Sequence, residues 1–96
     1  MHPTSGIIEA RNPRDILVAT SRMLSQFWHD RDGALLEEPP VPGVVHSIDE
    51  IDRCVARVQD ALRTRALLGR DEEALDRLLG YLMVASVRGR QLARAS

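Results

Sequence analysis

Residues 47–62 read SIDEIDRCVARVQDAL, and this stretch predicts a helix from its first turn onward. The Ser47 hydroxyl is placed to accept from the N–H of Glu50 while the Glu50 carboxylate reaches back to the N–H of Ser47, which is a reciprocal capping box. Apolar residues then recur at spacings of three and four, which is typical of a buried helix seam: Ile48, Ile51, Val55, Val58 and Leu62. We expect this helix to run for about 20 residues until Gly69 closes it.

Another helix is predicted directly after this one. Asp71 is expected to cap it, with Glu72 and Glu73 in the first turn, where carboxylates favour the positive end of the helix dipole. One face collects the apolar and small residues Leu75, Leu78, Leu79, Leu82, Ser86, Gly89 and Ala93. Because only residues 69–71 connect the two helices, we expect them to form an antiparallel hairpin.

Upstream, residues 12–32 predict an amphipathic helix that is the first of the chain. Asn12 suits the cap, Pro13 the first helical position and Asp15 the first turn, while Gly33 is a C-terminal stop. At about 100° per residue, one arc holds Ile16, Leu17, Thr20, Met23, Leu24, Phe27 and Trp28. The sequence therefore predicts an all-α protein built as a three-helix bundle.

Residues 33–46 form a Pro-rich connection between the first two predicted helices. In a polyproline-like conformation these fourteen residues reach about 40 Å, whereas an eighteen-residue helix is about 27 Å long. The connection is long enough to return along the bundle, so the first helix is expected either to lie parallel to the second or to dock on another subunit. The PxxP spacing at 39–42 is interpreted as a stiff spacer. Residues 1–11 are predicted to be a flexible N-terminal arm, in which Ile7-Ile8 adds a short strand.

Composition excludes several classes of protein. A chain of 96 residues with 44% hydrophobic and 28% charged residues is expected to be one soluble, folded domain. The net charge is −1 with acidic and basic residues interspersed, so no overall footprint for nucleic acid or membrane is present. The longest nearly apolar run, residues 78–87, is about half of what a membrane crossing needs. The single Cys54 suits a reducing compartment, and we expect a cytoplasmic location.

Residue types that perform catalysis or bind metals are present, but their spacing does not bring them together. Ser25 and His29 lie four residues apart, with Asp30 and Asp32 following, yet this face of the helix is polar and is expected to be solvated. The three histidines are scattered, and Cys54 has no partner at zinc-type spacing. We predict no catalytic, cofactor-binding or metal-binding residues.

The last predicted helix carries apolar residues on more than one side, in the stretch GYLMVASV at 80–87. A helix of this kind is buried on more than one side. A line of small residues follows at intervals of four, namely Ala85, Gly89 and Ala93, and it suits the chain's own first helix, a second copy or a different protein. We therefore predict a protein–protein interaction module, such as a subunit, adaptor or inhibitor, that binds itself or another protein. Trp is frequent among the residues that dominate binding energy, and the predicted contact residues are Trp28, Tyr81, Val84, Ala85, Val87 and Gly89.

An alternative prediction is a DNA-associated regulator of transcription or of plasmid or phage functions, with Arg88, Arg90 and Arg94 as contacts. The turn at Gly69 lies between two helices as in a helix-turn-helix, but the second helix would present carboxylates to the phosphates. A third alternative is an enzyme whose site is assembled between two subunits.

Overall fold

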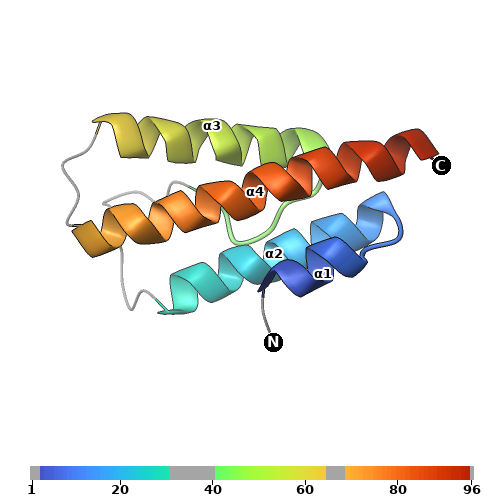
Figure 1. Ribbon diagram of the computed structural model, residues 1–96, viewed down its shortest axis with the longest axis horizontal. Coiled ribbons are helices and arrows are strands. Elements are labelled where there is room, and N and C mark those ends of the chain that lie inside the picture. Colours follow the sequence, from blue (N-terminus) through green and yellow to red (C-terminus); the bar gives the residue numbers. More distant parts are fainter. Residues whose placement is uncertain (1–2, 31–40, 65–68, 96) are drawn as a thin grey trace.

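All regular secondary structure in the described part of the chain is helical. The computed structural model describes residues 3–30, 41–64 and 69–95, with the side chains of 6–29, 41–64 and 72–95. These ranges contain four helices and no strand: α1 (Pro3–Glu9), α2 (Pro13–Asp30), α3 (Ile48–Thr64) and α4 (Gly69–Ala95) (Figure 1). The predicted all-α class is confirmed, whereas the number of helices is four instead of three.

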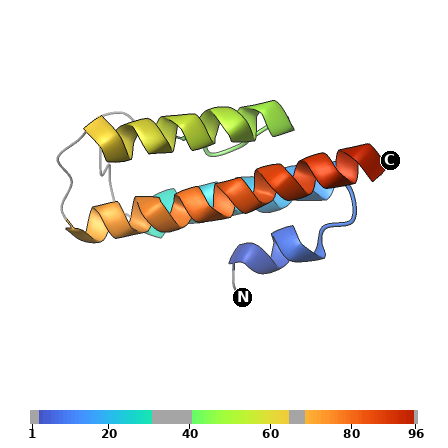
Figure 2. The ribbon, with the colours of Figure 1, turned by 45° about the horizontal axis from the view of Figure 1, so that its top comes forward.

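The longest helix, α4, organises the molecule. Its 27 residues extend about 40 Å, which nearly equals the 42 Å length of the protein. It packs against α3 on one side and against α1 and α2 on the other (Figures 1 and 2). The colours of Figure 1 show that α2 and α3 run in the same direction and that α4 runs in the opposite one. Every other helix therefore relies on α4 for part of its buried surface.

The sequence predicts a flexible arm for residues 1–11, whereas the structure has the helix α1 within this range. The expectation of a strand at Ile7-Ile8 is wrong, because both residues lie in α1, where Ile7 is fully buried and Ile8 is exposed. A Cβ added at Gly6 would lie 3.1 Å from the Cβ of Ala19, so α1 approaches α2 closely at this point. Burial of Ile7 against the core stabilises a helix too short to form alone.

Asn12 caps α2 as predicted. The N–H of Asp15 donates to Oδ1 of Asn12 over 2.9 Å, which satisfies one of the free donors of the first turn. The Asp15 carboxylate in turn accepts from the N–H of Arg11, at 3.3 Å. The cap therefore fixes the point at which the chain turns from α1 into α2.

The capping box of α3 forms with one difference from the prediction. The N–H of Glu50 donates to the Ser47 hydroxyl at 3.2 Å, as expected. The Glu50 carboxylate, however, accepts from the N–H of His46 at 2.5 Å and not from that of Ser47. The Glu50 carboxylate thus binds the N–H of the residue before the cap. The same arrangement occurs at α2, where the Asp15 carboxylate accepts from the N–H of Arg11, the residue before Asn12.

The boundary between α3 and α4 differs from the expectation. The last described residue of α3 is Thr64, and Gly69 belongs to the first turn of α4, so it does not close α3. Asp71 consequently lies inside α4 and is not the residue that precedes it. Carboxylates are favourable at several positions of a first turn, so an acidic run locates the start of a helix only to within a few residues.

Residues 41–47, which we call the strap, lead back along α2 to the start of α3. Val41 and Val45 of the strap are buried in the core, at 1% and 3% exposure. The strap is the described part of the predicted Pro-rich connection, and residues 33–40 lie outside the described residues. Its course explains how two helices that run in the same direction follow each other in the chain (Figure 1).

Candidate functional site

Three large apolar side chains gather on the outer face of α4. Met83, Val84 and Val87 are 49%, 47% and 57% exposed, and they lie within a little more than one turn. Gly80 lies one turn before Val84 on the same face and is also exposed. We call Gly80, Met83, Val84 and Val87 the α4 strip. The other exposed large apolar side chains of the described residues lie singly, as Ile8 on α1, Val18 on α2 and Val44 on the strap.

The two glycines in the interior of α4 have different surroundings. A Cβ at Gly89 would lie 2.4 Å from Cδ1 of Ile48 and 3.4 Å from Cγ2 of Ile16, so Gly89 allows α4 to approach the chain's own helices. A Cβ at Gly80 would meet nothing within 4 Å. Gly in a helix interior costs about 1 kcal/mol relative to Ala. Packing within the described chain thus accounts for Gly89 but not for Gly80.

Charged residues of opposite sign lie at the two ends of the α4 strip. Glu72 and Asp76 precede it and are exposed, while Arg90 and Arg94 follow it and are exposed. At about 100° per residue these four lie along one edge of the strip, on the side of Met83. That edge of the strip is therefore apolar in the middle, negative at one end and positive at the other, while the exposed Arg77 lies along the opposite edge at the negative end.

That edge of α4 is tied to α3 through Asp52. The Ser86 hydroxyl donates to Oδ1 of the Asp52 carboxylate, and the Arg90 guanidinium forms an ion pair with Oδ2. Both contacts bridge α3 and α4 at their outer edge. Burial of Leu75, Leu82 and Ala85 sets the rotation of α4 about its own axis, and these contacts add to it at the outer edge.

The predicted contact residues divide into exposed and internal ones. Val84 and Val87 are exposed as expected, but Ala85 is fully buried and Gly89 is buried against Ile16 and Ile48, so these two are corrected to core positions. The predicted small-residue line therefore serves the chain's own packing at these two positions.

Trp28 and Tyr81 are also used within the chain. Both are partly buried against the core, and the Trp28 indole donates to the carbonyl of Val41 in the strap at 3.1 Å. Trp28 further makes an edge-to-face contact with Phe27, with ring centroids 5.0 Å apart. Neither side chain stands free as an anchor for a partner.

Gly80 and Met83 are the members of the α4 strip that the predicted contact residues did not include, and Met83 is the larger of the two side chains. Its spacing of four residues from Val87 was the available signal.

Two of the three arginines proposed as DNA contacts bind their own chain. Arg88 donates to the carbonyl of Ala10 at 3.1 Å, just after the end of α1, and Arg90 pairs with Asp52. Arg94 is exposed in the last turn of α4. The three side chains therefore have different surroundings and do not form one basic row.

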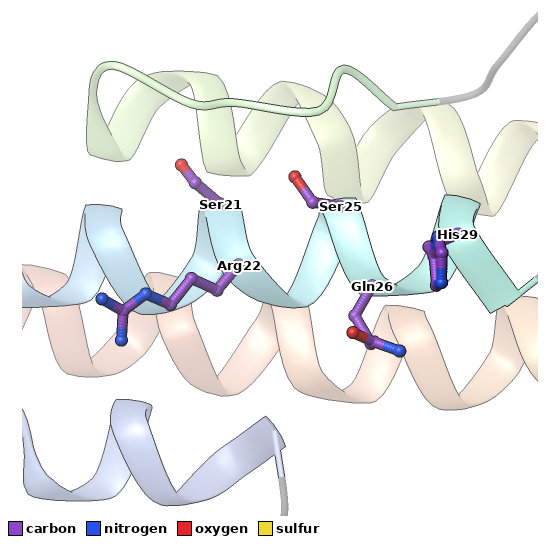
Figure 3. A pocket seen from close by; sticks show the side chains of 5 residues that line it. All are labelled: Ser21, Arg22, Ser25, Gln26 and His29. Carbon is purple, nitrogen blue, oxygen red and sulfur yellow. The ribbon is translucent and has the colours of Figure 1, made fainter.

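An open hollow on α2 is lined by Ser21, Arg22, Ser25, Gln26 and His29 (Figure 3). In Figure 3 both serine side chains point toward the strap, whereas Arg22 and Gln26 point away from it. Ser25 Oγ donates to the carbonyl of Gly43, and Ser21 Oγ accepts from the N–H of Val45, each at 3.1 Å. The hydroxyl that was considered as a nucleophile thus holds the strap, and the side chains of Asp30 and Asp32 lie outside the described part.

A second hollow of about 320 Å³ lies between the strap and α3, and Cys54 forms part of its wall. Burial raises the pKa of the Cys54 thiol, nearby Arg57 lowers it and Glu50 raises it, with a raised pKa as the result. A thiol of this kind is neutral and unreactive at pH 7. Within the described ranges, no group of three or more His, Cys, Asp or Glu side chains comes together in a way that suits a metal ion.

Comparisons with known proteins found no match to this chain among family models, curated proteins or solved structures. Among the described residues, no helix combines the length and the apolar character that a bilayer crossing requires. Among the described residues, the α4 strip is the largest group of neighbouring exposed apolar side chains.

Proposed function

We propose that this chain is a small helical protein–protein interaction module whose binding surface is the α4 strip. The observation that supports the proposal is the exposure of Met83, Val84 and Val87 side by side on one helix face. Contiguous apolar surface framed by polar residues is typical of interaction sites, whereas single exposed apolar residues are not. A subunit, an adaptor and an inhibitor all act through such a surface.

The size of the α4 strip indicates a modest affinity. Complete burial of a Val or Met side chain contributes about 1.5–3 kcal/mol, so covering the exposed half of each contributes about 1 kcal/mol. Three such side chains give about 3 kcal/mol, which is less than the cost of association, about 4–15 kcal/mol. A partner must therefore add apolar surface of its own, and charge pairs at the rim then set orientation and specificity.

The helices behind the α4 strip are well suited to present it. We propose that α3 and α4 act as the helical hairpin expected from the sequence, with Asp52 adding to the packing of α4 against α3 through Ser86 and Arg90. A rigid platform lowers the entropy that is lost on binding. The neutral, buried Cys54 suits a reducing compartment, so the proposal retains a cytoplasmic location.

The proposal is tested with a photoreactive phenylalanine analogue at position 84 and, as a control, at position 18. Val84 and Val18 are 47% and 44% exposed, but Val18 lies on α2 away from the α4 strip. After irradiation in the native host, intact-mass measurement is expected to show protein adducts from position 84 and few from position 18. Equal yields at the two positions, or no adduct at position 84, would contradict the proposal.

A further inference from the structure

We propose that the α4 strip binds a second copy of the same chain, with the two α4 helices antiparallel about a two-fold axis that passes between Met83 and Val84. This inference rests on the proposed function and names its partner. It places Gly80 of one copy opposite Val87 of the other, and the acidic end of one strip beside the basic end of the other.

The first argument is the match between Gly80 and Val87. Gly80 leaves an open notch, because a Cβ there would meet nothing within 4 Å, and Val87 is the most exposed member of the strip, at 57%. A two-fold axis places Gly80 of one copy opposite Val87 of the other only if it passes halfway between these positions along α4, and Met83 of one copy then lies at the level of Val84 of the other. The same axis therefore places Val87 of one copy against Gly80 of the other and brings Met83 and Val84 of both copies to the centre of the contact.

The second argument is the distribution of charge along the strip. A two-fold axis perpendicular to the helices keeps each edge of α4 on the same side and reverses its direction. Glu72 and Asp76 of one copy then lie beside Arg94 and Arg90 of the other, at both ends of the contact. A parallel arrangement would instead bring carboxylates beside carboxylates and guanidinium groups beside guanidinium groups, which is unfavourable.

Self-complementarity is what distinguishes a second copy from other occupants. An interface between identical chains about a two-fold axis requires that the same surface patch complement itself. The α4 strip meets this requirement in shape, through Gly80 and Val87, and in charge, through the residues at its two ends. Binding to a different protein would not require the α4 strip to be complementary to itself in shape and charge.

Association is measured by sedimentation equilibrium of the purified chain up to about 1 mM, a range suited to a weak dimer. We expect the unaltered chain and Val18→Arg to dimerise, and Val84→Arg to stay monomeric with the same circular dichroism. Gly80→Ala fills the notch, so it is expected to raise the dissociation constant about tenfold while the melting temperature of the monomer rises. A monomeric unaltered chain at about 1 mM, or a dimeric Val84→Arg variant, would overturn the inference.

The antiparallel register is tested by exchanging the charges. Glu72→Arg alone places Arg beside Arg94 of the second copy, and Arg94→Glu alone places Glu beside Glu72, so each variant is expected to dimerise at least about tenfold more weakly. A one-to-one mixture of the two variants restores opposite charges at both ends, and we expect it to recover dimerisation. A mixture no stronger than either variant alone would overturn the register.

The proposed function and this inference fail in different ways. A purified chain that remains monomeric, combined with adducts from position 84 to a different protein in the host, would remove the second copy and keep the interaction module. Adducts at position 84 whose mass equals twice that of the chain support both. The absence of adducts at position 84 together with a monomeric chain removes both.

Discussion

The hydroxyl of Ser21 is expected to stabilise the whole fold, because it binds the strap in the core. Ser21 Oγ accepts from the N–H of Val45 at 3.1 Å, and Val45 is 3% exposed. The spacing of the contacts is matched on the two segments. Ser21 and Ser25 lie about 6 Å apart along α2, and Val45 and Gly43 lie about 6.6 Å apart along an extended strap, so both serines reach it at once.

Ser21→Ala leaves a partly buried N–H without its acceptor, which costs about 1–2 kcal/mol. The better helix propensity of Ala returns about 0.5 kcal/mol. The expected net loss in the free energy of unfolding is therefore about 0.5–1.5 kcal/mol, and each 1 kcal/mol lowers the melting temperature by about 4–8 °C in a domain of this size.

Ser25→Ala is the matched control. Its hydrogen bond to the Gly43 carbonyl is exposed, so water replaces the lost donor and the propensity gain offsets the remainder. We expect a change of no more than about 0.5 kcal/mol. Urea unfolding is followed by circular dichroism and by the fluorescence of Trp28, the single tryptophan, whose indole donates to Val41 of the strap. Equal stabilities of the two alanine variants would refute the reasoning.

Four further predictions concern three single buried or open positions. Gly80→Ala is expected to raise the free energy of unfolding by about 0.5–1 kcal/mol, since a Cβ there meets nothing, and thermal melting at low concentration checks it. Thr20→Val is expected to raise the free energy of unfolding by about 1 kcal/mol, because the fully buried Thr20 hydroxyl has no hydrogen-bond partner among the described residues. Thr20→Ser, which keeps the hydroxyl, is expected to show no gain. Cys54 is expected to react with iodoacetamide far more slowly in the folded chain than in urea. Since burial raises the pKa of the Cys54 thiol above its usual value, the folded state binds the proton more tightly. Stability is therefore expected to decline as the pH rises from that usual value through the raised pKa, which urea unfolding at a series of pH values measures.

Local signals in the sequence predicted the parts of the fold that local contacts determine. Asn12 and Ser47 cap their helices as expected, because a side-chain oxygen and an N–H three residues on suffice to form the motif. The short α1 was missed for the opposite reason. It has no comparable cap signal, and its formation depends on burial of Ile7 against helices that are distant in the sequence.

The candidate site could be predicted only in part for a related reason. The excess of apolar residues on α4 indicated an exposed apolar surface, and Val84 and Val87 are exposed. The side of α4 that the other helices cover depends on its rotation, which packing against helices distant in the sequence sets through Leu75, Leu82 and Ala85. Ala85 was therefore assigned to the contact surface and Met83 was left out of it, since a helical wheel does not show where the neighbours lie.

The central position of α4 has a consequence for the order in which the molecule is made. Synthesis proceeds from the amino end, so α1, α2 and α3 leave the ribosome before α4, against which each of them packs. At roughly 5–20 residues per second, the 27 residues of α4 take about 1–5 s to follow. Ile51 and Val58 of α3 are therefore covered only after the last residues of the chain have been added, and the complete core forms at the end of synthesis.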